Sequence, residues 1–227
     1  GIGGFLLGIT AFPLLHLVPL GKAWRTEKAR ALIHHSFRLF VWFMQFCGVL
    51  RVRLIDAHKL RNLQSCLVIA NHPTLIDVVI LISLVRNCDC VVKEGLWRNP
   101  FLRGVVSAAD YISNSDSDQL IDDCAGALNG GGTLIVFPEG TRSVPGTPLK
   151  FKRGAANMAV RSRCDVVPVG IQCEPPSLMK GQHWYQVPRH THVTVTVSVG
   201  ERFAVQPVIA GADNPTLAAR RLNQYFE

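Results

Sequence analysis

The chain has 227 residues, 48% of them hydrophobic, which excludes an intrinsically disordered chain and favours one compact domain with a smaller appendage. Its 24 Lys and Arg residues exceed its 16 Asp and Glu residues, and the resulting charge of +8 favours an anionic partner such as a phosphorylated substrate or an acidic lipid surface. Because no helix-turn-helix, RNP or zinc-finger motif accompanies this charge, we expect no nucleic-acid partner.

Residues 1–47 form the first predicted unit, a membrane-associated helical hairpin. Residues 1–20 carry no charge and lead into a basic stretch, and a second apolar run covers 37–50. About twenty apolar residues can cross a bilayer, but prolines and glycines weaken a straight helix, so spanning and dipping both stay open. The cations, held at the headgroup level, favour the cytoplasmic face of the (inner) membrane. The alternative is a helical pair buried against the main domain.

Residues 48–227 form the second predicted unit, in which β-rich runs alternate with helical stretches. We expect strands at 49–55, 66–70, 90–93, 110–113, 133–137, 165–171 and 192–199, and helices near 75–86, 100–108, 117–129, 153–162 and 215–226. Such alternation predicts an α/β domain with a mostly parallel central sheet flanked by helices.

The seven cysteines are scattered, lie mostly within apolar runs and include no CxxC pair. This pattern indicates buried thiols in a reducing compartment. Cys88 and Cys90 lack a second Cys or His pair at zinc spacing, so we expect no metal site.

The sequence NHPTLID, residues 71–77, inserts polar residues between two apolar runs. On a regular helix five residues turn the chain by about 500°, which would hold His72 and Asp77 apart. Pro73 favours an extended His72, and Thr74 can cap a helix that starts at the next residue, so we expect a bend that joins the two side chains. An imidazole held by a carboxylate through one nitrogen can act as a general base through the other.

Two features of this motif bear on its interpretation. With no GxSxG motif and no Ser or Cys beside the pair, the attacking hydroxyl would belong to the substrate. Thr74 and Asp77 also fit a capping box, which would explain Asp77 without any catalysis.

A second motif, VFPEGTRS at 136–143, leaves a buried strand as a polar loop, the position at which α/β proteins bind ligands. Arg142 offers donors suited to a phosphate, Gly140 permits close backbone approach, and Thr141 adds a hydroxyl. The alternative is a solvated turn in which Glu139 pairs with Arg142. The cations of KFKRG, residues 150–154, stand just before a predicted helix N-terminus, which also favours anions.

Together, NHPTLID, FPEGTRS and the later VVPVGI resemble the glycerolipid acyltransferase family, which includes the 1-acylglycerol-3-phosphate acyltransferases. The likeness covers about residues 49–205. It implies that His72 is the general base, that Asp77 orients this base, and that Glu139 and Arg142 bind the acceptor. It also implies substrate-binding roles for Lys93, which lies between the two main motifs, and for Pro168 in the last motif. A membrane-docking N-terminal helical pair is likewise familiar in that family.

We therefore expect a membrane-associated O-acyltransferase of phospholipid metabolism and lipid biosynthesis. It would move a fatty acyl group from acyl-CoA or acyl-ACP, the acyl carrier protein thioester, to a hydroxyl of a lysophospholipid-like acceptor. The donor is a co-substrate, and this chemistry needs no cofactor. Asn71 or a nearby backbone amide is expected to stabilise the oxyanion of the tetrahedral intermediate.

One departure from the family pattern concerns the acceptor. The second family motif usually ends in an arginine that helps to hold phosphate, whereas DYISNSD, residues 110–116, places Asn114 or one of its neighbours there. Losing a charge-assisted hydrogen bond costs about 1.5–3 kcal/mol. Either Lys93, Arg142 and Lys152 suffice, or the acceptor is another lyso-lipid, an amino-acid lipid or a lipid-linked aryl polyene. A catalytically inactive lipid-binding protein would keep the same motifs and is the alternative from another class.

Overall fold

The structure is a computed structural model that describes residues 21–114, 117–144, 146–182 and 192–226. Its helices are α3 Lys22–Phe46, the 3-10 helix η1 Ala57–Leu60, α4 Asp77–Leu84, α5 Gly95–Arg98, α6 Arg103–Ala108, α7 Ser117–Asn129, α8 Gly154–Ser162, α9 Gln206–Ala210 and α10 Pro215–Phe226. Its strands are β1 Leu50–Ile55, β2 Cys66–Ala70, β3 Cys88–Val92, β4 Ile112–Ser113, β5 Thr133–Val136, β6 Asp165–Glu174 and β7 Val193–Val199.

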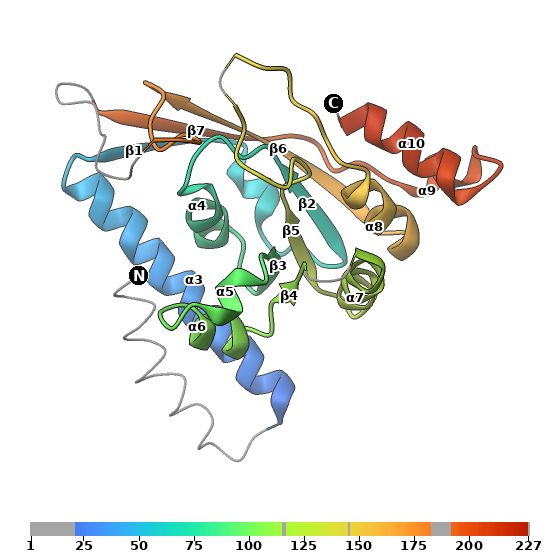
Figure 1. Cartoon of the computed structure of the whole chain (residues 1–227), viewed down its shortest axis with the longest axis horizontal. Helices are drawn as coiled ribbons and strands as arrows, with labels where there is room; N and C mark the ends of the chain where they lie inside the picture. Colours follow the sequence, from blue (N-terminus) through green and yellow to red (C-terminus); the bar gives the residue numbers. More distant parts are fainter. Residues whose placement is uncertain (1–20, 115–116, 145, 183–191, 227) are drawn as a thin grey trace.

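The described strands form one seven-stranded sheet in the order β1-β7-β6-β2-β5-β3-β4 (Figure 1). All neighbours run parallel except β6 and β7, which pair antiparallel. The central strands β2 and β5 are buried at every position, as expected for strands covered on both faces, whereas β7 alternates buried valines with half-buried residues. The predicted α/β fold with a mostly parallel sheet is therefore confirmed.

Helices cover both faces of the sheet and create two apolar cores. The first core contains buried residues of α3 and α4, and the second contains buried residues of α7, α8 and α10. Figure 1 shows α3 and α4 on one side of the central strands and α7, α8 and α10 on the other. The two faces meet at the edge where the parallel strands end, so residues that follow β2 and β5 can contact groups from both sides.

The helix α3 forms the described part of the predicted N-terminal unit. The basic stretch and residues 37–46 of the second apolar run form one continuous helix, which ends before β1. Its buried residues Ala29, Ile33 and Val41 lie four and eight positions apart along the chain and make one stripe against the domain. The first arm of the predicted hairpin, 1–20, lies outside the described residues. Within the described part of the chain, no helix is both long and apolar enough to span a bilayer.

Arg30 is one of the cations of the basic stretch that follows residue 20, which were predicted to lie at the headgroup level. The structure places it elsewhere. Its side chain is almost buried and pairs with Asp89 of β3, while its Nε donates to the carbonyl oxygen of Ala109 at 2.9 Å. A guanidinium can enter a protein interior when a carboxylate and a carbonyl accept its protons. This contact fixes the N-terminal half of α3 to the domain.

Most predicted elements of the domain match the observed ones. The helices at 117–129 and 215–226 have the predicted bounds. The helix expected at 100–108 is observed as α6 at 103–108, and the separate short helix α5 at 95–98 precedes it. Asn99 and Pro100 separate these two short helices, and a proline is tolerated only at the start of a helix. The short helices η1, α5 and α9 were not predicted.

The prediction of buried thiols is confirmed for five of the seven cysteines; Cys47 is exposed and Cys173 is half-buried. Burial raises the pKa of Cys66, Cys90 and Cys124 to about 12, which keeps these thiols protonated and unreactive near neutral pH. The described residues contain no cluster of His, Cys, Asp and Glu that could hold a metal ion.

Candidate active site

The two polar motifs meet at the edge of the sheet where β2 and β5 end. These strands are direct neighbours, with Ile69 opposite Val136, so the chain leaves the sheet at adjacent places. The backbone N–H of Ser143 donates to the carbonyl oxygen of His72 at 2.7 Å, and the backbone N–H of His72 donates to Oε1 of Glu139 at 2.8 Å. The sheet therefore places the histidine corner and the loop after β5 in direct contact.

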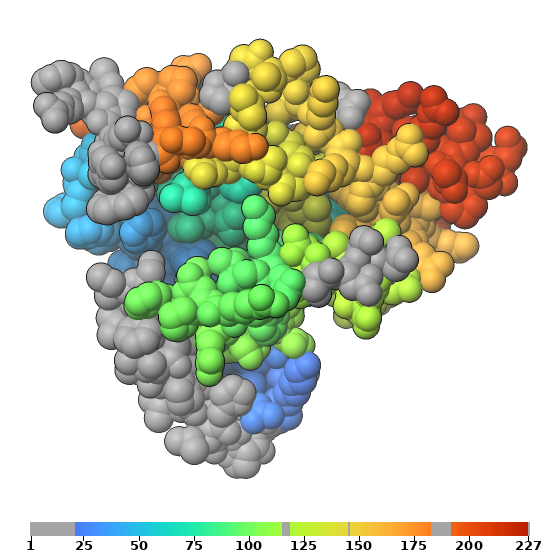
Figure 2. Space-filling view, viewed as in Figure 1, coloured from blue at the N-terminus to red at the C-terminus, as the bar shows by residue number. Residues whose placement is uncertain are grey.

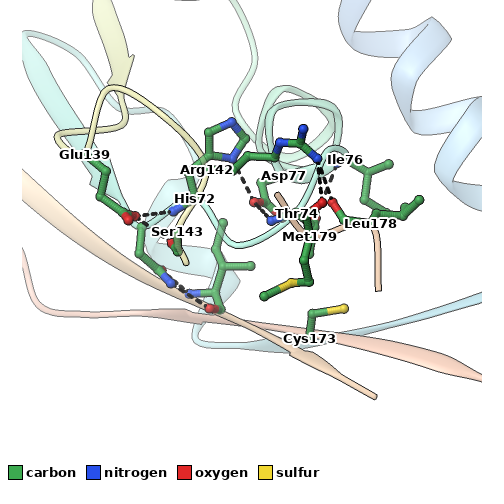
Figure 3. Close-up of polar contacts among 12 residues, drawn as sticks. His72, Thr74, Ile76, Asp77, Glu139, Arg142, Ser143, Cys173, Leu178 and Met179 are labelled. Atoms are coloured by element: carbon green, nitrogen blue, oxygen red, sulfur yellow. Dashed lines mark hydrogen bonds and ion pairs between the residues drawn. The ribbon is translucent and has the colours of Figure 1, made fainter. Parts of the chain in front are cut away.

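The hydrogen bond predicted between His72 and Asp77 is confirmed. Nδ1 of His72 lies 2.9 Å from Oδ2 of Asp77, whose side chain is fully buried (Figure 3). Because a carboxylate only accepts, Nδ1 carries the proton and Nε2, on the far side of the ring, keeps a free lone pair. The ring packs on Phe137 with the centroids 4.3 Å apart. The imidazole is thus held in one tautomer and one orientation.

The helix that carries Asp77 starts later than predicted. It begins at Asp77 itself with Ile76 at the N-cap position, so Thr74 does not cap a helix starting at residue 75. The carboxylate accepts hydrogen bonds from the His72 ring, from the Thr74 backbone N–H at 2.6 Å and from the Thr74 hydroxyl. Residues 72–76 close around this carboxylate instead of forming a first helical turn. The bond from the Thr74 N–H is half of a capping box, so Asp77 serves the corner and the imidazole together.

Glu139 and Arg142 do not pair with each other among the described residues, which corrects the solvated-turn alternative. Oε1 of Glu139 accepts the backbone N–H of His72 and also the Ser143 hydroxyl at 2.8 Å. Nη1 of Arg142 donates to the carbonyl oxygens of Leu178 and Met179 at 3.1 and 2.9 Å. Nε and Nη2 of Arg142 have no partner in the described parts of the chain. A guanidinium has five N–H donors, so three remain open to an anion.

The segment 175–182 lies beneath the histidine corner. The carbonyl oxygen of Leu178 accepts both the Arg142 guanidinium and the backbone N–H of Leu75, the latter at 3.1 Å. Figure 2 shows this segment, in orange, beside the yellow loop that follows β5. Arg142 therefore holds segment 175–182 to its own loop, and the Leu178 carbonyl group extends the connection to Leu75. This structural role was not indicated by the motif.

Gly140 and Lys152 form the other side of the loop. Gly140 has φ +68°, and a Cβ atom there would lie 3.0 Å from Nζ of Lys152. Only glycine combines this backbone conformation with so close an approach. The backbone N–H of Lys152 donates to the carbonyl oxygen of Pro138 at 2.9 Å, and its side chain is exposed. An ammonium group and the open guanidinium of Arg142 thus belong to one loop region beside His72.

The remaining predicted site residues have different surroundings. Asn71 uses its amide on the backbone of Ile171, donating from Nδ2 at 2.8 Å and accepting at Oδ1 at 2.6 Å, and so ties the end of β2 to β6. Pro168 lies in β6 opposite Ile69. Thr141 and Lys93 are exposed, the latter directly after β3. The Asn71 contact was not predicted, because one amide residue before a histidine carries no signal for a partner 100 positions away.

Asn114 also has a structural partner. Its Oδ1 accepts the backbone N–H of Glu94 at 3.0 Å, and its backbone N–H donates to the carbonyl oxygen of Val92. Asn114 thus ties the end of β3 to the short strand β4. It offers no positive charge to a ligand.

Comparison with known proteins agrees with this arrangement. The model of the family described as Acyltransferase matches residues 51–172, more than half of the chain. The chain is 28% identical over 175 residues to a chloroplastic 1-acyl-sn-glycerol-3-phosphate acyltransferase, BAT2, of Brassica napus, covering 72% of this chain and 50% of that protein. It is 29% identical over 140 residues to the human 1-acyl-sn-glycerol-3-phosphate acyltransferase alpha, covering 58% of this chain and 49% of that protein. The chain thus spans about half the length of these curated relatives.

A solved structure shares the fold. The crystal structure of the 1-acyl-sn-glycerophosphate acyltransferase PlsC from Thermotoga maritima superposes with a TM-score of 0.64 at 20% sequence identity. The match covers 99% of this chain and 93% of that chain. The correspondence therefore extends over the whole architecture.

Proposed function

The chain belongs to the acyltransferase family, and from this premise we propose that it transfers a fatty acyl group from an acyl thioester to a hydroxyl of a lysophospholipid-like acceptor. The observation that carries the proposal is the imidazole of His72, held by a buried carboxylate and facing a loop that bears open cationic donors. The names of the relatives support a glycerophosphate acceptor.

The proposed reaction uses His72 as a general base. Nε2 takes the proton of the acceptor hydroxyl while the hydroxyl oxygen attacks the carbonyl carbon of the thioester. A C–O bond forms to the acceptor, and the C–S bond of the thioester then breaks. The thiolate then leaves and takes the proton from the imidazole, giving an ester and a free thiol. Asp77 holds the Nδ1 proton throughout and stabilises the imidazolium that forms in between. Acyl-CoA or acyl-ACP supplies the acyl group.

The phosphate of the acceptor is proposed to bind the three open N–H groups of Arg142 and the ammonium group of Lys152. Both groups belong to the loop that contacts the His72 backbone. Since Asn114 is uncharged and bonded to Glu94, it adds no cation to this site. This observation favours a second candidate, an acceptor other than lysophosphatidate, such as another lyso-lipid, an amino-acid lipid or a lipid-linked aryl polyene.

Lys152→Ala should distinguish between these acceptors. We expect the KM for lysophosphatidate to rise about tenfold or more, because a charge-assisted hydrogen bond contributes about 1.5–3 kcal/mol, while the KM for uncharged monoacylglycerol stays unchanged. Thiol release with a common acyl-CoA measures both values. Arg86→Ala removes an exposed cation just before β3, at the opposite edge of the sheet, and is the matched control. Equal KM values for lysophosphatidate in the wild type and Lys152→Ala would refute the phosphate role.

The C-terminal half of α3 is proposed to dock onto a bilayer, at the cytoplasmic face of the membrane. Five large side chains are exposed there: Leu39, Phe40, Trp42, Phe43 and Phe46. Trp42 and Phe46 stack with their ring centroids 5.4 Å apart and are 57% and 76% exposed. Apolar patches of this kind mark interaction sites, and a bilayer is the partner that a lipid-modifying enzyme must reach. The division into a docking unit 1–47 and a catalytic unit 48–227 is part of this proposal.

Liposome flotation tests the docking surface. Trp42→Ser combined with Phe46→Ser should reduce the bound fraction of protein at least tenfold, because burying each large apolar side chain contributes about 1.5–3 kcal/mol. Tyr225→Ser on α10, which changes another exposed aromatic residue, should float like the wild type. If the double variant floats as well as the wild type, α3 does not dock through this surface.

A further inference from the structure

A small apolar pocket opens at the same edge of the sheet as His72, on the other face. Its volume is about 200 Å³, and its walls include Leu149, Phe151, Pro168, Gly170 and Phe226. Phe226 comes from α10, which packs with the second core, whereas Asp77 starts α4, which packs with the first core. The pocket also touches Asn71, the residue before the histidine.

We propose that this pocket holds the phosphopantetheine arm of the thioester donor, an inference that rests on the proposed acyl transfer at His72. In an acyl thioester the fatty chain and the arm extend in opposite directions from the reacting carbonyl group. If the fatty chain lies on the apolar side of α3 and α4, the arm crosses the strand edge toward α10. The pocket, with Asn71 on one side and Phe226 of α10 on another, lies in this direction.

The chemistry of the walls fits the gem-dimethyl part of such an arm. The wall side chains named above are apolar, and the amide of Asn71 is already satisfied by both backbone groups of Ile171. A volume of about 200 Å³ is smaller than that of whole-ligand pockets, which run from about 300 to 1,000 Å³, so only a segment of the donor fits. The two amides of the arm can stay hydrated, because the pocket opens to solvent.

Charge complements the other end of the arm. The segment that provides Leu149 and Phe151 to the pocket also carries Lys150 and Arg153, whose side chains are exposed. Phosphopantetheine ends in a phosphate, and in coenzyme A this phosphate continues into a nucleotide with further phosphates. An apolar pocket whose lining segment also carries exposed cations therefore matches an arm that is apolar in its middle and ends in phosphate.

Gly170 gives the pocket its space. A Cβ atom added at this position would meet nothing closer than the backbone oxygen of Ser198, at 4.0 Å. A glycine inside a strand forgoes a packed side chain and often marks the close approach of a ligand. The strand would accept valine at Gly170, and the new side chain would occupy the pocket.

The test compares Gly170→Val with the wild type by equilibrium binding of coenzyme A and of holo-acyl carrier protein, two sources of the same arm. The dissociation constant of the source that binds the wild type more tightly should rise at least tenfold. Gln172→Val, with the same new side chain two residues further along β6 and outside the pocket, is the matched control and should bind like the wild type. Thermal unfolding verifies that both variants are folded. Unchanged affinity in folded Gly170→Val overturns the proposal.

A kinetic comparison separates this inference from the proposed function. Two donors with the same acyl chain are compared: acyl-CoA, and the acyl-N-acetylcysteamine thioester, which lacks the gem-dimethyl group and the phosphates. In Gly170→Val the ratio of kcat/KM for acyl-CoA to kcat/KM for the shorter thioester should fall at least tenfold. Leu149→Ala changes a pocket residue on an exposed segment and is the second variant, to be used if Gly170→Val fails to fold. It should lower the same ratio. If donor binding depends on Gly170 but the wild type releases no thiol, the proposed acyl transfer is refuted and the pocket assignment is supported. If the wild type releases thiol and the ratio is unchanged in Gly170→Val, the acyl transfer is supported and the pocket assignment is refuted.

Discussion

Replacing His72 by alanine should lower acceptor-dependent thiol release by about a hundred- to ten-thousandfold, the contribution of a positioned general base. The ring is the proposed base because Asp77, whose Oδ2 lies 2.9 Å from Nδ1, fixes the proton on Nδ1 and leaves Nε2 free. The assay uses an acyl-CoA donor with a panel of lyso-lipid acceptors, and liberated thiol is measured. Asp77→Asn should also lose most activity, because an amide no longer stabilises the imidazolium.

The His72 side chain is a minor part of the fold, so the loss can be separated from unfolding. The backbone N–H and carbonyl group of His72, which bind Glu139 and Ser143, remain in the alanine variant. We therefore expect similar thermal unfolding of His72→Ala and the wild type. Equal thiol release by the two proteins across the panel would favour a catalytically inactive lipid-binding protein.

Local chemistry made much of the fold and the centre of the site predictable. The alternation of β-branched runs with amphipathic stretches is written in neighbouring residues, and so is the bend at Pro73 that brings His72 to Asp77. The loop after β5 was predictable because parallel strands end at a common edge, where polar residues meet.

Contacts between distant residues were not predictable in this way. Nothing near Arg142 indicates that it donates to carbonyl groups 36 and 37 positions away, and nothing near Asn71 indicates Ile171. The start of α4 was missed for a related reason. Propensity favours an early cap at Thr74, but the three hydrogen bonds to the Asp77 carboxylate set the start of the helix.

The burial of Arg30 leads to the second large expected effect, on stability. Arg30→Ala should lower the free energy of unfolding by about 3–5 kcal/mol, because it leaves the Asp89 carboxylate buried without its partner. Small domains are stable by only about 5–15 kcal/mol, so urea unfolding at pH 7.5 would show a large shift of the midpoint. Lys22→Ala, which removes an exposed ion pair with Asp110 from the same helix, is the control and should cost less than about 1 kcal/mol.

The cost of Arg30→Ala should also depend on pH in a definite direction. Burial raises the pKa of Asp89, and the Arg30 charge opposes that rise, so removing Arg30 should raise the pKa further. A carboxyl group whose pKa is higher in the folded than in the unfolded state favours folding below its unfolded pKa and loses this contribution as the pH rises through the folded pKa. The variant should therefore be closer to wild-type stability at pH 4.5 than at pH 7.5.

The paired replacement Arg30→Met with Asp89→Leu removes both charges and should recover most of the loss, since apolar residues can replace a buried ion pair without penalty. A uniform loss at both pH values, unrelieved by the double replacement, would show that Arg30 stabilises the protein through packing of its alkyl chain and not by neutralising Asp89.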